Sequence, residues 1–346
     1  MITHLAYITE YMLRIVYILL FALVTTACSI DNLEPQILGN TMGTTYSVQW
    51  HPQDVSASQL KQKIDDRLQA INALMSTYDA SSELSQFNQS RDTGWHAVDP
   101  TLAALVDLSA HIHQNSQGAF DITVGPLVNL WGFGPDQAEF SFPDDGEIQI
   151  AQRSVGAQHL MVRSDPPALY KNIPDLYVDL SAIAKGYGVD AVANIMEQAG
   201  VENYMVEIGG EVKCKGVGYH GDAWRIGIEA PNFERGKIEE ILALDNIAVA
   251  TSGDYRNFIE HQGQYYSHTI DPTTGYPVTH NLGSITVAHQ SAAQADAWAT
   301  ALLVLGPERA LEIANQQQLP VLMITREARG YKSTSNQYMR RYLHTP

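Results

Sequence analysis

The chain has 346 residues, of which 38 are acidic and 21 basic, giving a formal charge of −17 with histidines neutral. Charged residues are 17% of the chain and hydrophobic residues 45%, which excludes intrinsic disorder, because disordered chains are poor in apolar residues and rich in charge. The acidic balance argues against a nucleic-acid partner, whose phosphates would be repelled. The length fits one large domain or two ordinary ones. With only Cys28 and Cys214, a disulfide framework and a zinc site built on several thiolates are excluded.

Residues 1–27 are interpreted as a signal peptide. Arg14 precedes an uninterrupted apolar run over Ile15–Val24, which is too short to cross a bilayer core, because a spanning helix needs about 20 residues. A basic residue, a short apolar stretch and then small residues are typical of a secretory signal. The residues before Met12 are a poor amino-terminal region for such a signal, so the start of translation is left open between Met1 and Met12.

Cys28, directly after small residues, predicts a lipid anchor. Its placement resembles a bacterial lipoprotein signal, in which the cysteine becomes the lipidated first residue, although Thr25 departs from the usual aliphatic residue. A secreted protein cleaved near Ala27 without lipid is the alternative. We expect residues 28–40 to be a tether and residues 41–346 a domain held by acyl chains on the periplasmic side of a bacterial membrane. The inner membrane is favoured, and the outer membrane stays open.

Two helices are predicted in the first part of the domain. Before them, Thr41–Val48 alternates in hydrophobicity, as a strand does. Ser56 with Gln59 resembles a capping box, and apolar residues with helical spacing follow it. An Asp-Pro pair at 99–100 starts a second helix, which Gly118 ends. The apolar stripes of these helices are Leu60, Ile64, Leu68, Ile71 and Met75, and Leu102, Leu105, Val106 and Ile112.

The second part of the chain mixes strands and helices without strict βαβ alternation. A third helix is predicted over Ala184–Ala199, stopped by Gly200. Helices over Ala292–Leu305 and Pro307–Gln317 precede a last strand, Val321–Thr325. The other predicted strands are Tyr204–Ile208, Glu211–Val217, Trp224–Ile228, Ile247–Ala250 and Ile285–Ala288. This order favours an α+β fold, a largely antiparallel sheet packed with helices in one compact unit, with two lobes as the alternative.

Several motifs match known sites in letters but not in context. Gly216–Gly221 fits the fingerprint G-x-G-x-x-G, but a strand-like segment follows where dinucleotide binding needs a helix, so we interpret it as a hairpin turn. His111 and His113 are two apart on a helix and cannot face one ligand together. They are interpreted as ordinary surface or edge histidines, and Cys214 as a small packed residue in a strand. The sequence has no H-E-x-x-H, G-x-S-x-G or P-loop motif.

Three segments carry groups suited to an anion, a metal ion or a proton. In Val178–Gly188 an acidic residue is followed by small residues and then by Lys185 near a predicted helix start. The main-chain N–H groups at a helix start and the charge of a lysine both favour binding of phosphate. Asp296 and Thr300 project from one helix face, and hard oxygen ligands suit Mg²⁺. His268, beside a turn, is a candidate base near neutrality. Taken singly, each is more often an ordinary cap, solvated residue or turn.

Together these segments make the chain resemble the ApbE family, the periplasmic FAD:protein FMN transferases, over essentially its whole mature length. So many matches in one order make coincidence improbable, and the lipoprotein signal agrees with them. The resemblance rests on Thr41–Thr44, Met75–Tyr78, Gly118–Pro126, Asp179–Gly186, Glu207–Glu211, Thr251–Tyr255, His268–Pro272 and Ala295–Thr300.

In this family FAD is cleaved, its FMN half is joined through phosphate to a threonine of a partner protein, and AMP leaves. The resemblance implies that Asp296 and Thr300 hold Mg²⁺ by their side chains, with main-chain oxygens of Ala182 and Ala299, and His268 is the candidate for taking the threonine proton. It implies as acceptors subunits of the sodium-pumping NADH:quinone reductase, of Rnf-type complexes, or other exported flavoproteins. The residues implied to line the FAD site are Met42, Tyr78, Ala119, Phe120, Asp121, Asp179, Lys185 and Ile270.

Two other functions stay open on the sequence. An FAD pyrophosphatase would use the same metal and leaving group, with water in place of the threonine. A periplasmic flavin-binding lipoprotein without enzymatic activity would keep FAD intact. We rank the transferase first, the hydrolase second and the flavin-binding protein third.

Overall fold

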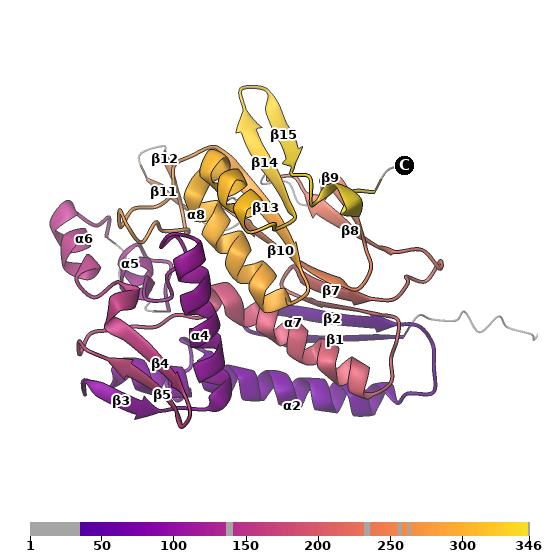
Figure 1. Cartoon of the computed structure of the whole chain (residues 1–346), viewed down its shortest axis with the longest axis horizontal. Helices are drawn as coiled ribbons and strands as arrows, with labels where there is room; N and C mark the ends of the chain where they lie inside the picture. Colours follow the sequence, from indigo (N-terminus) through magenta and orange to yellow (C-terminus); the bar gives the residue numbers. More distant parts are fainter. Residues whose placement is uncertain (1–34, 136–140, 232–235, 255–257, 262–263, 345–346) are drawn as a thin grey trace, which may run out of the picture. The chain divides into compact units, whose positions relative to one another are not determined.

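An eight-stranded antiparallel sheet organises the chain, in the order β1-β2-β6-β7-β10-β13-β14-β15 (Figure 1). The computed structural model describes residues 35–135, 141–231, 236–254, 258–261 and 264–344. Every neighbouring pair in this sheet is antiparallel, which confirms the predicted fold class. The strands are β1 (Gln36–Thr41), β2 (Thr44–Trp50), β6 (Tyr204–Ile208), β7 (Glu211–Lys215), β10 (Ile247–Gly253), β13 (Leu282–His289), β14 (Val321–Glu327) and β15 (Gly330–Ser335).

Helices cover one face of this sheet (Figure 1). Alternating strand residues such as Val48 and Val206 share a buried cluster with Leu68 and other helix residues, because successive strand side chains point to opposite faces. Ser56 begins the first of these helices, its Oγ accepting a hydrogen bond from the Gln59 N–H. The helices on this face are α2 (Ala57–Met75), α7 (Ser181–Gln198) and α8 (Ala292–Gln316), and α4 (Pro100–Asn115) packs beside α8.

A β-hairpin packs against the opposite face of the sheet. Its strands, β8 (Trp224–Glu229) and β9 (Ile238–Leu244), share a buried cluster with Val212 and Cys214 of β7. Cys214 is a buried free thiol, which confirms its interpretation as a packed strand residue. The loop over Gly216–Gly221 leads into β8, so the dinucleotide site is correctly excluded. The hairpin-turn interpretation is wrong, because β7 and β8 belong to different sheets.

Smaller elements form two further parts of the fold. One is a sheet in the order β3-β5-β4, whose buried Lys171 donates hydrogen bonds to the main-chain oxygens of Phe87 (2.8 Å) and Ser90. The other surrounds a cluster with Trp131 and Ile148 at its centre. The first part contains α3 (Glu83–Gln89), β3 (Gly94–Ala97), β4 (Leu160–Ser164) and β5 (Pro167–Lys171). The second contains α5 (Gly125–Leu130), α6 (Asp145–Gln152), β11 (Phe258–His261) and β12 (Gln264–Ser267). The chain also has the 3₁₀ turns η1 (Ala157–His159) and η2 (Arg340–Tyr342).

Three predicted boundaries change. The strand expected over Thr41–Val48 is a hairpin, because Met42 and Gly43 take φ of 49° and 71° and turn the chain between β1 and β2. Since β1 begins at Gln36, residues 36–40 belong to the sheet rather than to the expected tether. Helix α7 begins at Ser181, earlier than predicted. The predicted break between two helices near residue 306 is confirmed, because Gly306 has φ 74° and ψ 172° inside α8.

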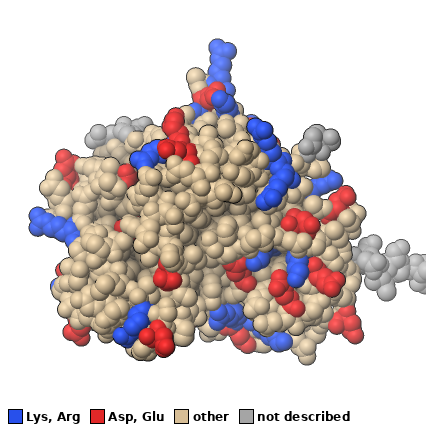
Figure 2. Space-filling view, viewed as in Figure 1, with Lys and Arg blue, Asp and Glu red and all other residues tan. Residues whose placement is uncertain are grey.

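The chain from Gln36 onward forms one compact unit, whereas the predicted signal peptide and Cys28 lie outside the described residues. Within the described ranges, every helix is too short or too polar to cross a bilayer. Figure 2 shows acidic and basic side chains interspersed over the face in view rather than gathered by sign. An anion bound to this face would therefore depend on local groups rather than on the net charge.

Candidate functional site

Three charged side chains from α7, β7 and α8 meet on the helix-covered face of the sheet. The Lys185 ammonium donates a hydrogen bond to Glu211 Oε1 (2.5 Å) and lies 3.8 Å from Asp296 Oδ1. The other oxygen of Asp296 accepts a hydrogen bond from the Gly186 main-chain N–H at 3.0 Å. Both carboxylates are buried. One lysine from the predicted phosphate-binding segment thus joins the predicted metal ligand Asp296.

The cluster holds more negative than positive charge in a buried place. Burial raises the pKa of Asp296 to about 7; the Glu211 charge acts in the same direction, and Lys185 and the Gly186 N–H oppose it. Glu211 Oε2 is buried and, among the described residues, has no hydrogen-bond partner. Two carboxylates share one ammonium, so a bound cation would relieve the excess charge.

The oxygen atoms near Asp296 fit Mg²⁺, which prefers hard oxygen ligands and keeps several waters. Thr300 lies one turn further along α8, with its Oγ1 3.2 Å from Ser252 Oγ on β10. Helix geometry aims the Gly186 N–H at the Ala182 carbonyl, and the same N–H donates to Asp296 Oδ2, so the Ala182 carbonyl lies near the Asp296 carboxylate. Ala299 has only a methyl side chain, so its main-chain carbonyl is the one oxygen that it could offer. Within the described ranges, no three His, Cys, Asp or Glu residues group as a metal site.

Two tight turns press against Lys185 and α7. Gly209, with φ +62°, lies where an added Cβ would be 2.9 Å from Thr44 Cγ2 and 3.3 Å from Lys185 Cδ. The turn residue Met42 reaches α7, its Cε 3.1 Å from the position of a Cβ at Gly188. The structure therefore brings the motif around Met42 and the glycines after β6 to the Lys185 cluster.

Asp179 and Tyr78 lie near the N-terminus of α7. The Asp179 carboxylate accepts hydrogen bonds from the Ser181 N–H (2.8 Å) and hydroxyl (2.5 Å), and its own N–H donates to the Ile122 carbonyl (2.7 Å). Partial burial and the charge of Asp179 raise the pKa of Tyr78. Tyr78 nevertheless exposes 69% of its surface, so its ring is open to stack on a planar ligand.

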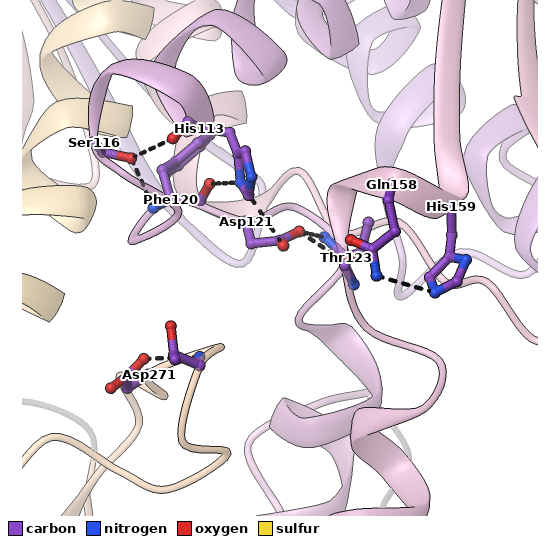
Figure 3. Close-up of polar contacts among 10 residues, drawn as sticks. His113, Ser116, Phe120, Asp121, Thr123, Gln158, His159 and Asp271 are labelled. Atoms are coloured by element: carbon purple, nitrogen blue, oxygen red, sulfur yellow. Dashed lines mark hydrogen bonds and ion pairs between the residues drawn. The ribbon is translucent and has the colours of Figure 1, made fainter.

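The Asp121 side chain lies between His113 and Thr123 (Figure 3). Its Oδ1 accepts hydrogen bonds from the N–H (2.8 Å) and hydroxyl (2.6 Å) of Thr123, and its side chain is 5% exposed. Ala119 and Phe120 are also buried, so a ligand would meet the main chain of this segment. His113, interpreted as an ordinary surface or edge residue, is half-buried: its Nδ1 lies 2.8 Å from the Phe120 carbonyl and 3.8 Å from Asp121.

His268 and Ile270 belong to a second, aromatic cluster. The His268 ring packs edge-on with Phe133, their centroids 6.2 Å apart. Ile270 is buried with Trp131, whose indole N–H donates to the Gly275 carbonyl at 2.8 Å. The candidate base is thus carried by the α5–β12 part of the fold, whereas the candidate metal ligands lie at the crossing of α7 and α8.

Sequence reasoning gave no role to Glu211 and Ser252, which the structure places in the site. Glu211 and Lys213 alternate with Val212 and Cys214, and charged residues at every second position of a strand with an apolar face are a usable signal of a polar partner. Ser252 carries no comparable signal, because a serine in a strand is common.

Comparison with known proteins places these features in one family. Residues 42–323 match the ApbE family. The chain is 42% identical over 323 residues to an FAD:protein FMN transferase of Vibrio cholerae, covering 93% of this chain and 96% of that protein. Its structure is similar to the flavin transferase ApbE of V. cholerae (TM-score 0.83, 42% identity, 90% of this chain and 100% of that one). The TM-score to the Pseudomonas stutzeri flavinyl transferase ApbE is also 0.83, at 35% identity, covering 92% of this chain and 100% of that one. The chain therefore belongs to the ApbE family.

Proposed function

We propose that this protein transfers the FMN half of FAD to a threonine hydroxyl of an exported or membrane redox protein, with Mg²⁺ bound, and releases AMP. The observation that carries the proposal is the Lys185–Glu211–Asp296 cluster, formed by sequence motifs of a family whose relatives are named FAD:protein FMN transferase. Fixed positive charge beside buried oxygen ligands is what the cleavage of a diphosphate requires.

The reaction is a phosphoryl transfer. The threonine oxygen attacks the phosphorus on the riboflavin side, a new P–O bond forms, and the bond from that phosphorus to the bridging oxygen breaks. AMP leaves with the bridging oxygen, and the hydroxyl proton passes to His268. Lys185 holds positive charge beside the phosphates, and Tyr78 stacks on a ring of the substrate. Mg²⁺, held by Asp296, Thr300 and the main-chain oxygens of Ala182 and Ala299, would polarise the phosphate oxygens.

The expected acceptors follow from the resemblance to the family. They are subunits of the sodium-pumping NADH:quinone reductase or of Rnf-type complexes, or other exported flavoproteins. The protein would meet them on the periplasmic side of the membrane, anchored by lipid at Cys28, which lies outside the described residues.

One incubation separates the candidate functions. The purified protein is mixed with FAD, Mg²⁺ and a candidate acceptor, with the same acceptor carrying valine for threonine as a control. A transferase makes the threonine acceptor fluorescent in a denaturing gel, leaves the valine acceptor dark and releases AMP. Free FMN with AMP and no labelled acceptor would instead show the pyrophosphatase, and intact FAD would show a binding protein.

A further inference from the structure

A second polar cluster lies one helical turn along α7 from the proposed site. Asp190 Oδ1 accepts a hydrogen bond from the Lys213 ammonium on β7 at 2.7 Å. Its Oδ2 accepts hydrogen bonds from the Ser291 hydroxyl (2.7 Å) and from the Ala293 N–H (3.1 Å) at the start of α8. This cluster therefore joins the same three elements as the Lys185 cluster.

The two clusters tie α7 and α8 together in opposite directions. Asp296 extends from α8 to accept the Gly186 N–H of α7, and Asp190 extends from α7 to accept the Ala293 N–H of α8. The helices are in backbone contact between these bonds, because a Cβ at Gly186 would lie 2.3 Å from the Ala292 carbonyl oxygen. Because the helices are packed this closely, the Asp190 bonds set the position of α8 along α7. They therefore also set where the Asp296 carboxylate meets α7.

The same carboxylate also holds β7. Lys213 and Glu211 are two residues apart on this strand and point to the same face, toward α7. The Asp190–Lys213 ion pair therefore sets the position from which Glu211 reaches Lys185. Both side chains of the pair are about one-fifth exposed, at 20% and 22%, so screening by solvent is limited.

We infer that Asp190 is a positioning residue for the proposed magnesium and phosphate site. Its hydrogen bonds join it to Lys213, Ser291 and Ala293, none of which is a candidate ligand. It acts by holding α8 and β7, which carry Asp296 and Glu211, against the segment of α7 that carries Lys185. The inference rests on the proposed function. Residues that orient metal ligands from behind typically contribute about 10- to 100-fold to metal affinity.

The test compares Asp190→Asn with wild type and with Glu197→Gln. Glu197 pairs with Lys215 at 3.4 Å, also between α7 and β7, and takes no part in the bonds to α8, so it is a matched control. Mg²⁺ alone is titrated into FAD-free protein by calorimetry, and flavin transfer is measured against Mg²⁺ concentration at saturating FAD. We expect Asp190→Asn to need about tenfold more Mg²⁺ for half-saturation in both measurements, to regain kcat at saturating Mg²⁺, and Glu197→Gln to match wild type.

A lower melting temperature with an unchanged Mg²⁺ midpoint in Asp190→Asn would overturn the inference, because a merely structural role predicts that result. Should Asp190→Asn fail to fold, Ser291→Ala removes one of the bonds to Asp190 and should shift the midpoint in the same direction; no shift would again refute the role. If wild type itself neither binds Mg²⁺ nor transfers flavin, the proposed function fails. If wild type does both and Asp190→Asn matches it, only the positioning role fails.

Discussion

Replacing Gly186 with alanine tests how closely α7 and α8 must approach. The added Cβ would lie 2.3 Å from the Ala292 carbonyl oxygen, 2.6 Å from its carbon and 2.8 Å from Ala293 Cα. All three are backbone atoms of α8, which cannot swing aside as the end of a side chain does. The helices would have to separate by about 1 Å to restore ordinary contact distances.

The cost can be worked from these contacts. Overpacking of this kind costs about 1–3 kcal/mol, and separation also weakens the 3.0 Å bond from the Gly186 N–H to Asp296, which is worth about 1.5–3 kcal/mol. Alanine gains about 1 kcal/mol over glycine in a helix. We therefore expect Gly186→Ala to lower the free energy of unfolding by about 3 kcal/mol, although helix propensity alone predicts an increase.

Gly188→Ala is the matched control, because it makes the same change two residues along the same helix. Its Cβ would meet the ends of flexible side chains, Ile208 Cδ1 and Met42 Cε, each at 3.1 Å. We expect its free energy of unfolding to stay within about 1 kcal/mol of wild type. Urea unfolding followed by tryptophan fluorescence measures both variants. A Gly186→Ala protein as stable as Gly188→Ala would refute the backbone-contact reasoning.

Three other substitutions test separate parts of the argument. Asp296→Ala should abolish Mg²⁺-dependent flavin transfer while the circular dichroism spectrum stays native; full activity with Mg²⁺ would contradict its role as a ligand. His268→Ala should slow transfer at least about tenfold more than it weakens FAD binding measured by fluorescence titration. An equal loss of both would indicate a binding role instead. Lys171→Met should lower the free energy of unfolding by about 1–3 kcal/mol in urea, because the main-chain oxygens of Phe87 and Ser90 lose their buried donor; unchanged stability would count against that account.

Hydrophobic periodicity predicted the long elements because their faces are set by local spacing. The apolar stripe from Leu60 to Met75 is the buried face of α2, and Gly306 divides α8 as expected. The hairpin at Met42 was missed, because Thr41–Val48 was interpreted as one alternating run, whereas Met42 and Gly43 turn the chain at positive φ within it. The sheet of β3, β4 and β5 was missed because its strands lack a regular apolar alternation: β3 and β4 have no buried residue, and the two apolar residues that β5 buries are adjacent.

The site was predictable as a set of motifs but not as an arrangement. Lys185 and Asp296 lie far apart in sequence, and their contact depends on how α7 crosses α8, which no local pattern encodes. The Gly186 contact with Ala292 makes that crossing possible, and its tightness is visible only when both backbones are placed. The contact of His113 with the Phe120 carbonyl was not predictable either, because it depends on a chain segment that folds over the helix.

Because Cys214 is buried, the reactivity of its thiol reports on local opening between β7 and the β8–β9 hairpin. It is 1% exposed, and burial raises the pKa of its thiol, so the reactive thiolate is scarce in the folded protein. A thiol reagent can therefore modify Cys214 only when β7 parts from the β8–β9 hairpin. Because β7 also carries Glu211 and Lys213 on its other face, the labelling rate would measure how often the strand behind the proposed site is released from its packing.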